Sequence, residues 1–118
     1  MLEELRTVVY AVVDLDAAKA WYTDLLGQEP YFDEPFYVGF NVGGDELGLT
    51  PAEGGTDTSS TTYWAVPDAD AAYEALLARG GAPKAAVEDV GGGIRLGAVT
   101  DPFGNVLGVI YNPHFTLA

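Results

Sequence analysis

Two stretches of the sequence repeat the same order of apolar and polar residues. Residues 12–18 read Val-Val-Asp-Leu-Asp-Ala-Ala, and residues 66–72 read Val-Pro-Asp-Ala-Asp-Ala-Ala. Each stretch begins at the end of an apolar run, which covers residues 8–13 in the first copy and 63–66 in the second. Both runs have the length and composition typical of a β-strand. Each also begins a segment with helical periodicity. The chain is therefore predicted to contain two copies of a strand–helix unit.

The two helices are predicted from apolar residues at helical spacing. In the first helix they recur at i, i+3, i+4 and i+7, and in the second they form a shorter stripe. The residues are Ala18, Trp21, Tyr22 and Leu25 in the first helix, and Ala72, Ala75 and Leu76 in the second. Gly27 is expected to end the first helix, and Gly80 and Gly81 the second. The Asp at the start of each helix, Asp14 or Asp68, is expected to accept from the first free amides.

Three further strands are predicted after each helix. They cover about residues 30–32, 36–42 and 45–49 in the first copy, and 85–88, 95–100 and 105–109 in the second. Each last strand follows a turn signal, at residues 43–45 or 101–105. The second copy is about six residues longer than the first. The extra residues are expected in the loop that contains Gly91, Gly92 and Gly93.

These elements predict an α+β fold with two tandem βαβββ modules that form a cupped mixed sheet. One module alone would leave a sheet face exposed, so both are expected within a single domain of residues 1–118. Module one covers residues 1–51 and module two residues 61–113. Residues 52–60, rich in Gly, Thr and Ser, are the expected linker, and residues 114–118 form a C-terminal tail.

Composition narrows the classes of function. The chain has 118 residues, 48% of them hydrophobic, which is enough to form a core. It has no cysteine, which excludes disulfides, thiolate metal ligands and cysteine nucleophiles. The acidic start, Met1 to Glu4, is not that of a secretory signal, and no run approaches the ~20 apolar residues of a membrane span. We therefore expect a cytoplasmic protein that does not insert into membranes.

The charge is strongly negative. Eighteen acidic residues against five basic ones give a formal net charge of −13. Such a field repels nucleic acids and anionic lipid surfaces and attracts cations. The acidity either favours a cationic ligand or only keeps the protein soluble, and the sequence leaves both open.

Two motifs carry a family resemblance. Residues 12–27 resemble the opening helix of the glyoxalase/bleomycin-resistance/extradiol-dioxygenase (vicinal oxygen chelate) superfamily, and residues 101–110 resemble its closing hairpin and strand. The tail at residues 111–115 is similar to that of bacterial glyoxalase-like members. The resemblance covers nearly the whole chain. It implies two βαβββ modules around a cup, a metal held by the first and last strand of each module, and a homodimer.

The metal ligands of the family are missing from this sequence. The resemblance places the four ligand positions at Thr7, Gly48, Thr61 and Gly108. Glycine has no side chain, and threonine is a poor ligand where His, Gln or Glu is usual. The chain has one histidine, His114, outside the predicted strands. We therefore predict that the protein uses neither a metal nor another cofactor.

Strand alternation predicts which residues line the cup. The strand residues expected to face the helices, and not the cup, include Val8, Tyr10, Val12 and Trp64. On the third strand, alternation leaves two sets open: Phe36, Val38 and Phe40, or Tyr37, Gly39 and Asn41. The predicted ligand-binding residues are Thr7, Val9, Glu46, Gly48, Thr50, Thr61, Tyr63, Val106, Gly108 and Ile110. Gly48 and Gly108 either widen the cup for an organic ligand or only let the strands curve.

Glu46 is the one candidate catalytic residue. In an apolar cup its pKa would be raised, so it could act as a base or pair with a cation; otherwise it is solvated near the turn. Tyr63 is expected to stack on a ligand or to be a half-buried strand residue. The acid pairs at residues 33–34 and 88–89 are expected to be solvated. No Gly-x-Ser-x-Gly motif supports a triad of His114 with Ser59 or Ser60, and residues 91–93 form a flap or a slack hairpin rather than a phosphate loop.

The leading hypothesis for function is metal-independent binding or sequestration of a small cationic or aromatic molecule. It follows the bleomycin-resistance branch, which sequesters a cationic drug without chemistry. One alternative is a glyoxalase-like lyase or dioxygenase-type enzyme that uses an unrecognised metal site or Glu46 as a base. Another is a regulatory module whose cup is filled by its own aromatic residues.

Overall fold

The computed structural model describes residues 1, 5–52 and 61–114. The chain divides into two compact units, residues 1–57 and 58–118, and the division falls within the expected linker. Most of that linker, residues 53–60 with Ser59 and Ser60, lies outside the described residues, and so do tail residues 115–118. Over the described parts of the chain, none of the helices has the length and apolar character needed to cross a membrane.

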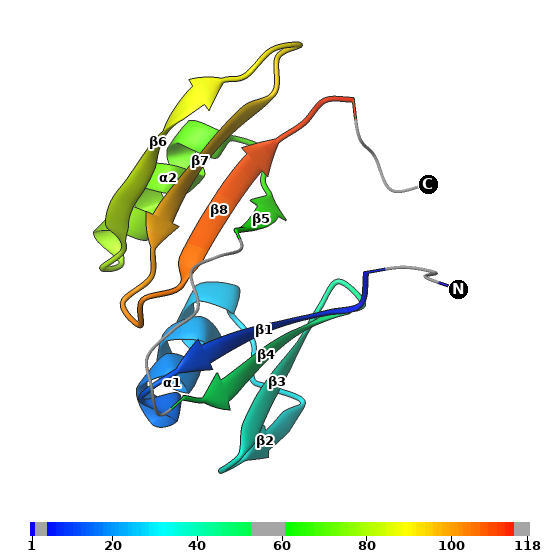
Figure 1. Ribbon diagram of the computed structural model, residues 1–118, viewed down its shortest axis with the longest axis vertical. Helices are drawn as coiled ribbons and strands as arrows, with labels where there is room; N and C mark the ends of the chain where they lie inside the picture. Colours follow the sequence, from blue (N-terminus) through cyan, green and yellow to red (C-terminus); the bar gives the residue numbers. More distant parts are fainter. Residues whose placement is uncertain (2–4, 53–60, 115–118) are drawn as a thin grey trace. The chain divides into compact units, whose positions relative to one another are not determined.

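The first unit is a four-stranded mixed sheet with one helix (Figure 1). Its strand order is β1-β4-β3-β2, with β1 parallel to β4 and the other pairs antiparallel. Its elements are β1 (Thr7–Val12), α1 (Leu15–Leu26), β2 (Phe32–Glu34), β3 (Tyr37–Val42) and β4 (Asp45–Pro51).

The second unit repeats this arrangement. Its strand order is β5-β8-β7-β6, again with one parallel pair, β5 with β8. The predicted α+β class and the two βαβββ modules are therefore confirmed. The elements are β5 (Thr62–Ala65), α2 (Ala69–Ala78), β6 (Ala82–Asp89), β7 (Arg95–Thr100) and β8 (Val106–Tyr111).

Two strands differ from their predicted bounds. β2 begins at Phe32 and not near Pro30, and all three of its residues are exposed, so no burial pattern marks its position. β6 is longer than predicted and begins before Pro83, which an edge strand tolerates because its outer amides need no partner. The register shifts between Pro83 and Ala85 and again before Glu88. The extra length of module two therefore lies partly in β6, which has eight residues against three in β2.

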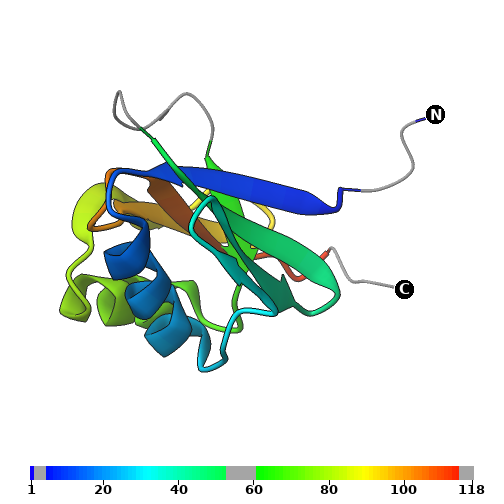
Figure 2. The same ribbon diagram turned by 90° about the horizontal axis from the view of Figure 1, so that it is seen from below.

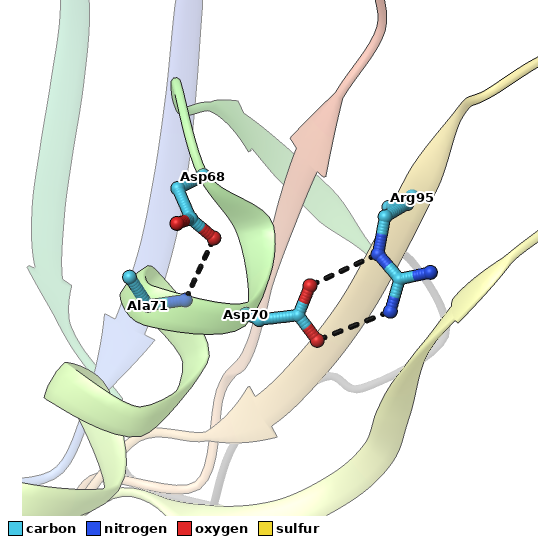
Figure 3. Close-up of polar contacts among 4 residues, drawn as sticks. All are labelled: Asp68, Asp70, Ala71 and Arg95. Carbon is cyan, nitrogen blue, oxygen red and sulfur yellow. Dashed lines mark hydrogen bonds and ion pairs between the residues drawn. The ribbon is translucent and has the colours of Figure 1, made fainter.

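Both helices begin as predicted. The Asp14 side chain accepts a hydrogen bond from the Ala17 amide at 3.0 Å, and Asp68 accepts one from Ala71 at 3.0 Å (Figure 3). Each bond satisfies a backbone donor that the first turn of a helix leaves free. α1 ends at Gly27, whose φ of 68° lies in the left-handed region that glycine adopts without strain.

The core of each unit lies between its helix and one face of its sheet (Figure 2). Ala18 and Tyr22 of α1 are fully buried, whereas Trp21 and Leu25 are only half-buried. In α2 the buried residues are Ala69 and Leu76, and the predicted core residue Ala75 is exposed. The buried apolar strand residues are Tyr10, Val12, Val38, Phe40, Leu47 and Leu49 in unit one, and Ala98, Val99, Val106, Leu107 and Val109 in unit two. Trp64, expected in the core, is half-buried, and Val8 is 39% exposed. The face opposite the helix is called the open face of each sheet below.

An ion pair joins helix to sheet in each unit. The Arg95 guanidinium of β7 donates to both oxygens of Asp70 in α2, at 2.9 and 3.1 Å, and this lowers the pKa of the Asp70 carboxyl (Figure 3). In unit one, Nζ of Lys19 in α1 lies 3.1 Å from Oδ2 of Asp33 in β2. Asp33 is thus exposed, as predicted, and it is paired. Because both pairs are exposed, we regard them as positioning contacts of small energetic weight.

We expect Asp14→Ala and Asp68→Ala each to lower the free energy of unfolding by about 1 kcal/mol, because each removes a helix cap. Urea denaturation followed by circular dichroism measures the loss. Asp14→Asn and Asp68→Asn are the matched controls, since Asn keeps the accepting oxygen and should retain most of the stability. Equal losses in the Asn and Ala variants would show that the charge of these residues, and not the capping hydrogen bond, stabilises the helices.

Candidate functional site

The open face of the first sheet holds the predicted residues of module one. In the parallel pair of β1 and β4, Thr7 lies opposite Glu46 and Val9 opposite Gly48. Thr50, two residues further along β4, shares this face. Val9 is 50% exposed, whereas its neighbour Tyr10 is buried on the helix side. These residues therefore lie together on a surface that a ligand can reach.

The turn between β3 and β4 determines which face of β3 joins this surface. Gly43 and Gly44 have φ values of 62° and 97°, as a two-residue type I′ hairpin turn requires. The turn pairs Asn41 with Glu46 and Gly39 with Gly48. The alternative left open by the sequence is thus resolved: Tyr37, Gly39 and Asn41 lie on the open face.

The ring of Tyr37 fills the space over Gly48. A Cβ atom on Gly48 would lie 2.6 Å from Cζ and 2.8 Å from Cε1 of Tyr37, and closer still to the hydroxyl oxygen. A Cβ atom on Gly39 would lie 2.8 Å from Oε2 of Glu46 and 3.1 Å from Cε1 of Tyr31. Of the two alternatives left open for Gly48, a widened cup is therefore not found at this position, because the two facing glycines make room for side chains of the same unit.

Those side chains form a hydrogen-bonded group. The Tyr37 hydroxyl donates to Oε1 of Glu46 at 2.8 Å, and the Tyr31 hydroxyl donates to Oε2. The Thr7 side chain is also hydrogen-bonded to the carboxylate. We call Tyr31, Tyr37 and Glu46 the tyrosine–glutamate group. Its three members come from β3, β4 and the segment before β2, where the Tyr31 amide donates to the Gly39 carbonyl oxygen at 3.0 Å, so all of them lie within the first unit.

These bonds set the protonation of the group. The hydrogen bond from Tyr31, helped by those from Tyr37 and Thr7, lowers the pKa of Glu46 although partial burial acts in the opposite direction. Burial and the bond to Glu46 raise the pKa of Tyr37 to about 12, and the bond to Glu46 raises the pKa of Tyr31. Of the two alternatives left open for Glu46, the raised pKa of an apolar setting is therefore not found. At neutral pH the group is an ionised carboxylate held by two protonated phenols, which makes it a weak base.

A cavity lies beside the group within the first unit. It has a volume of about 270 Å³. Among the residues that the structure describes, two carboxylates, those of Asp45 and Glu46, and one guanidinium, that of Arg6, line it and together carry a net charge of minus one. The described lining residues are Arg6, Thr7, Tyr31, Asn41, Gly44, Asp45 and Glu46.

The open face of the second sheet repeats the pairing of glycine with tyrosine. Tyr63 of β5 lies opposite Gly108 of β8, and a Cβ atom on Gly108 would lie 2.6 Å from Cδ1 of that ring. Tyr63 is 46% exposed, and Thr61, just before β5, is exposed as well. Val106 is buried and Ile110 half-buried. In both units a tyrosine therefore covers the glycine at the position where the resemblance places a metal ligand.

The donors that a metal needs are not found at these positions. Thr7 and Thr61 offer only hydroxyl groups, and the space over Gly48 and Gly108 is filled by tyrosine rings. Over residues 5–52 and 61–114, no group of three or more His, Asp or Glu side chains could hold a metal ion. The metal of the family thus does not fit the residues of this site.

His114 contacts the triglycine loop. Its Nε2 lies 2.6 Å from the carbonyl oxygen of Gly92. The loop joins β6 to β7, and Gly91, Gly92 and Gly93 all have positive φ. This contact fixes a hairpin loop to the segment after β8.

Tyr31 and Arg6 were not among the predicted binding residues, and Tyr37 and Asn41 stood only in one of the two sets left open for the third strand. A signal for two of them is present in the sequence. A Gly-Gly turn of two residues fixes the register of the hairpin, and counting outward from it places Asn41 and Tyr37 on the same face as Glu46. Tyr31 and Arg6 lie outside regular strands, so alternation does not reach them.

We expect Gly48→Ala to lower the free energy of unfolding by about 1–3 kcal/mol, the usual cost of overpacking, because the new methyl group would overlap the Tyr37 ring. In a Tyr37→Ala background the same change should cost nothing or stabilise slightly, since alanine loses less backbone freedom than glycine. Denaturant unfolding of the two single variants and the double variant measures this coupling. Equal costs in both backgrounds would show that the ring does not cover Gly48 in solution.

Comparisons with known proteins agree on the fold. No curated protein sequence matches this chain. A glyoxalase-related enzyme from Fulvimarina pelagi has a similar structure, with a TM-score of 0.81 at 21% identity over 99% of this chain and 94% of that chain. A lactoylglutathione lyase from Agrobacterium tumefaciens has a TM-score of 0.78 at 20% identity over 100% of both chains. A glyoxalase/bleomycin resistance protein from Catenulispora acidiphila has a TM-score of 0.67 at 28% identity over 93% of this chain and 100% of that chain.

A family model supplies the same result from the sequence. It describes the glyoxalase/bleomycin resistance protein/dioxygenase superfamily and matches residues 4–109, most of the chain. The two βαβββ modules and the structural neighbours are consistent with it. The chain therefore belongs to the glyoxalase/bleomycin resistance protein/dioxygenase superfamily.

Proposed function

We propose that this protein binds a small cationic or aromatic molecule without a metal ion. One observation carries the proposal: Tyr37 covers Gly48 and donates a hydrogen bond to Glu46. At a position that would need a metal-ligating side chain, the chain has a glycine, an aromatic ring and an ionised carboxylate. Such a surface can hold an organic ligand by packing and a few polar contacts.

The aromatic surface around the site supports this proposal. Tyr31 and Phe36 are 64% and 66% exposed, and Phe32 is 38% exposed. The ring of Phe32 lies 6.0 Å from those of Phe36 and Tyr37, centroid to centroid, in edge-to-face contact. These rings form an apolar surface that continues from Tyr37, which contacts Glu46, and exposed aromatic faces bind flat or cationic groups.

The charge of the protein also supports a cationic ligand. The net charge of −13 attracts cations over the whole surface, and the walls of the cavity carry a net charge of minus one. A ligand of the same sign would be repelled both on approach and at the site.

The enzymatic alternative has less support. Lactoylglutathione lyase and the oxidase ChaP-H2 share the fold at 20% and 18% identity, and likeness at that level concerns the fold alone. The lowered pKa of Glu46 makes it a weaker proton acceptor than an ordinary carboxylate. The alternative of a regulatory module is supported by the two tyrosine rings that cover Gly48 and Gly108, but a polar cavity of about 270 Å³ next to Glu46 favours binding. The proposal also includes a homodimer, as the family resemblance implies, and the cytoplasmic location expected from the sequence.

Thermal unfolding of the purified protein tests the proposal. We expect no shift of the melting temperature with EDTA or with Zn²⁺, Mn²⁺ or Ni²⁺, and an upward shift with some members of a panel of organic cations and aromatic molecules. A ligand that binds only the folded protein stabilises it by about 2.7 kcal/mol at a hundredfold excess over its dissociation constant. Glu46→Gln should reduce this shift.

Glu29→Gln is the matched control. Glu29 is exposed, lies in the turn after α1 and does not line the cavity, so this variant should respond to ligands as the parent does. A stabilisation by one of the metals that EDTA reverses, with no response to any organic molecule, would contradict the proposal.

A further inference from the structure

The tyrosine–glutamate group offers a ligand only hydrogen-bond acceptors. A phenol has one proton and two lone pairs, and both protons are already donated to Glu46, one to each carboxylate oxygen. The phenolic oxygens can therefore only accept a further bond. The ionised carboxylate has about four lone-pair sites and no proton, so it too can only accept. The group thus offers acceptors and no donors because of the way its hydrogen bonds are arranged, and this does not depend on the net charge of the protein.

The rest of the cavity is consistent with a ligand of one positive charge. Asp45 adds a second carboxylate to the wall, and Arg6 supplies one guanidinium. The side-chain oxygen of Asn41 already accepts from the Gly44 amide at 3.0 Å, which leaves its NH₂ as a donor. Asn41 can thus donate to a ligand, whereas the tyrosine–glutamate group, whose carboxylate already accepts from Tyr31, Tyr37 and Thr7, can only accept a further bond.

We infer that the ligand carries a compact cation with N–H donors, namely a primary ammonium, an amidinium or a guanidinium, and that the tyrosine–glutamate group binds this cation. Bonds from such a cation to a carboxylate are charge-assisted and stronger than neutral ones. A quaternary ammonium has the charge but no N–H, and a carboxylate or phosphate has neither. The cavity of about 270 Å³ lies at the lower end of small-molecule sites, which favours a compact head group. The inference rests on the proposed function and names the ligand class of the same site.

Five probes with the same benzyl or phenyl ring and different head groups test the inference. They are benzylamine, benzamidine, benzyltrimethylammonium, benzyl alcohol and benzoate, each titrated into the full chain by calorimetry and by ¹H–¹⁵N NMR. Benzylamine and benzamidine should bind at least about tenfold more tightly than the other three, because only they combine charge with N–H donors. Their shifts should fall on the amides of Thr7, Asn41 and Glu46.

Two variants of opposite sign complete the test. Glu46→Gln should weaken benzylamine binding about tenfold or more, because it removes the charged acceptor. Arg6→Gln should strengthen it several-fold, because it removes a like charge from an exposed position of the cavity wall. The second variant keeps the inference falsifiable should Glu46→Gln fail to fold, which its amide spectrum would show.

The inference is overturned if benzyltrimethylammonium binds as tightly as benzylamine, or if benzylamine affinity is the same in the parent and both variants. In either case binding without a metal still occurs, so the proposed function stands. The inference also fails if none of the five probes binds. If in addition the wider organic panel gives no response and a metal does, the proposed function fails with it.

Discussion

The hydrogen bond from Tyr37 to Glu46, made across Gly48, is the interaction on which the site depends. It needs glycine at two facing positions, because a Cβ atom on Gly39 or Gly48 would overlap the group. The hydrogen bond from Tyr31 and then that from Tyr37 lower the pKa of Glu46, while burial and the bond to Glu46 raise the pKa of Tyr37. Together the two phenol bonds leave only acceptors for a ligand.

This contact lies on the βαβββ framework of the superfamily. The βαβββ framework is retained in both units, and so are the Asp-capped helices that begin each module. What differs is the chemistry on the open faces, where glycines covered by tyrosines stand at positions that the resemblance assigns to metal ligands. The fold can present such a surface because β1 and β4, and likewise β5 and β8, place alternate residues on one face regardless of their identity.

Much of the fold could be predicted from the sequence, because repeated motifs and turn residues act locally. Asp14, Asp68 and Gly27 perform the capping roles that their types predict, and the internal repeat gives the βαβββ order. The site was less predictable. The pKa of Glu46 was expected to rise in an apolar setting, whereas the neighbouring hydroxyls of Tyr31 and Tyr37 lower it, and such neighbours are known only once strands are paired. Tyr31 lies between α1 and β2, where no periodicity indicates its direction.

Ionisation of Tyr37 in solution tests the central contact most directly. Protein with ¹³C at Cζ of its seven tyrosines can be titrated by NMR over the alkaline range in which its amide spectrum stays folded, with Tyr37→Phe to assign the resonance. The hydrogen bond from Tyr37 to Glu46 predicts a pKa of about 12 for Tyr37 and a lower value in Glu46→Gln, which removes the accepting charge. A Tyr37 pKa near the ordinary value of about 10 that does not change in Glu46→Gln would contradict it.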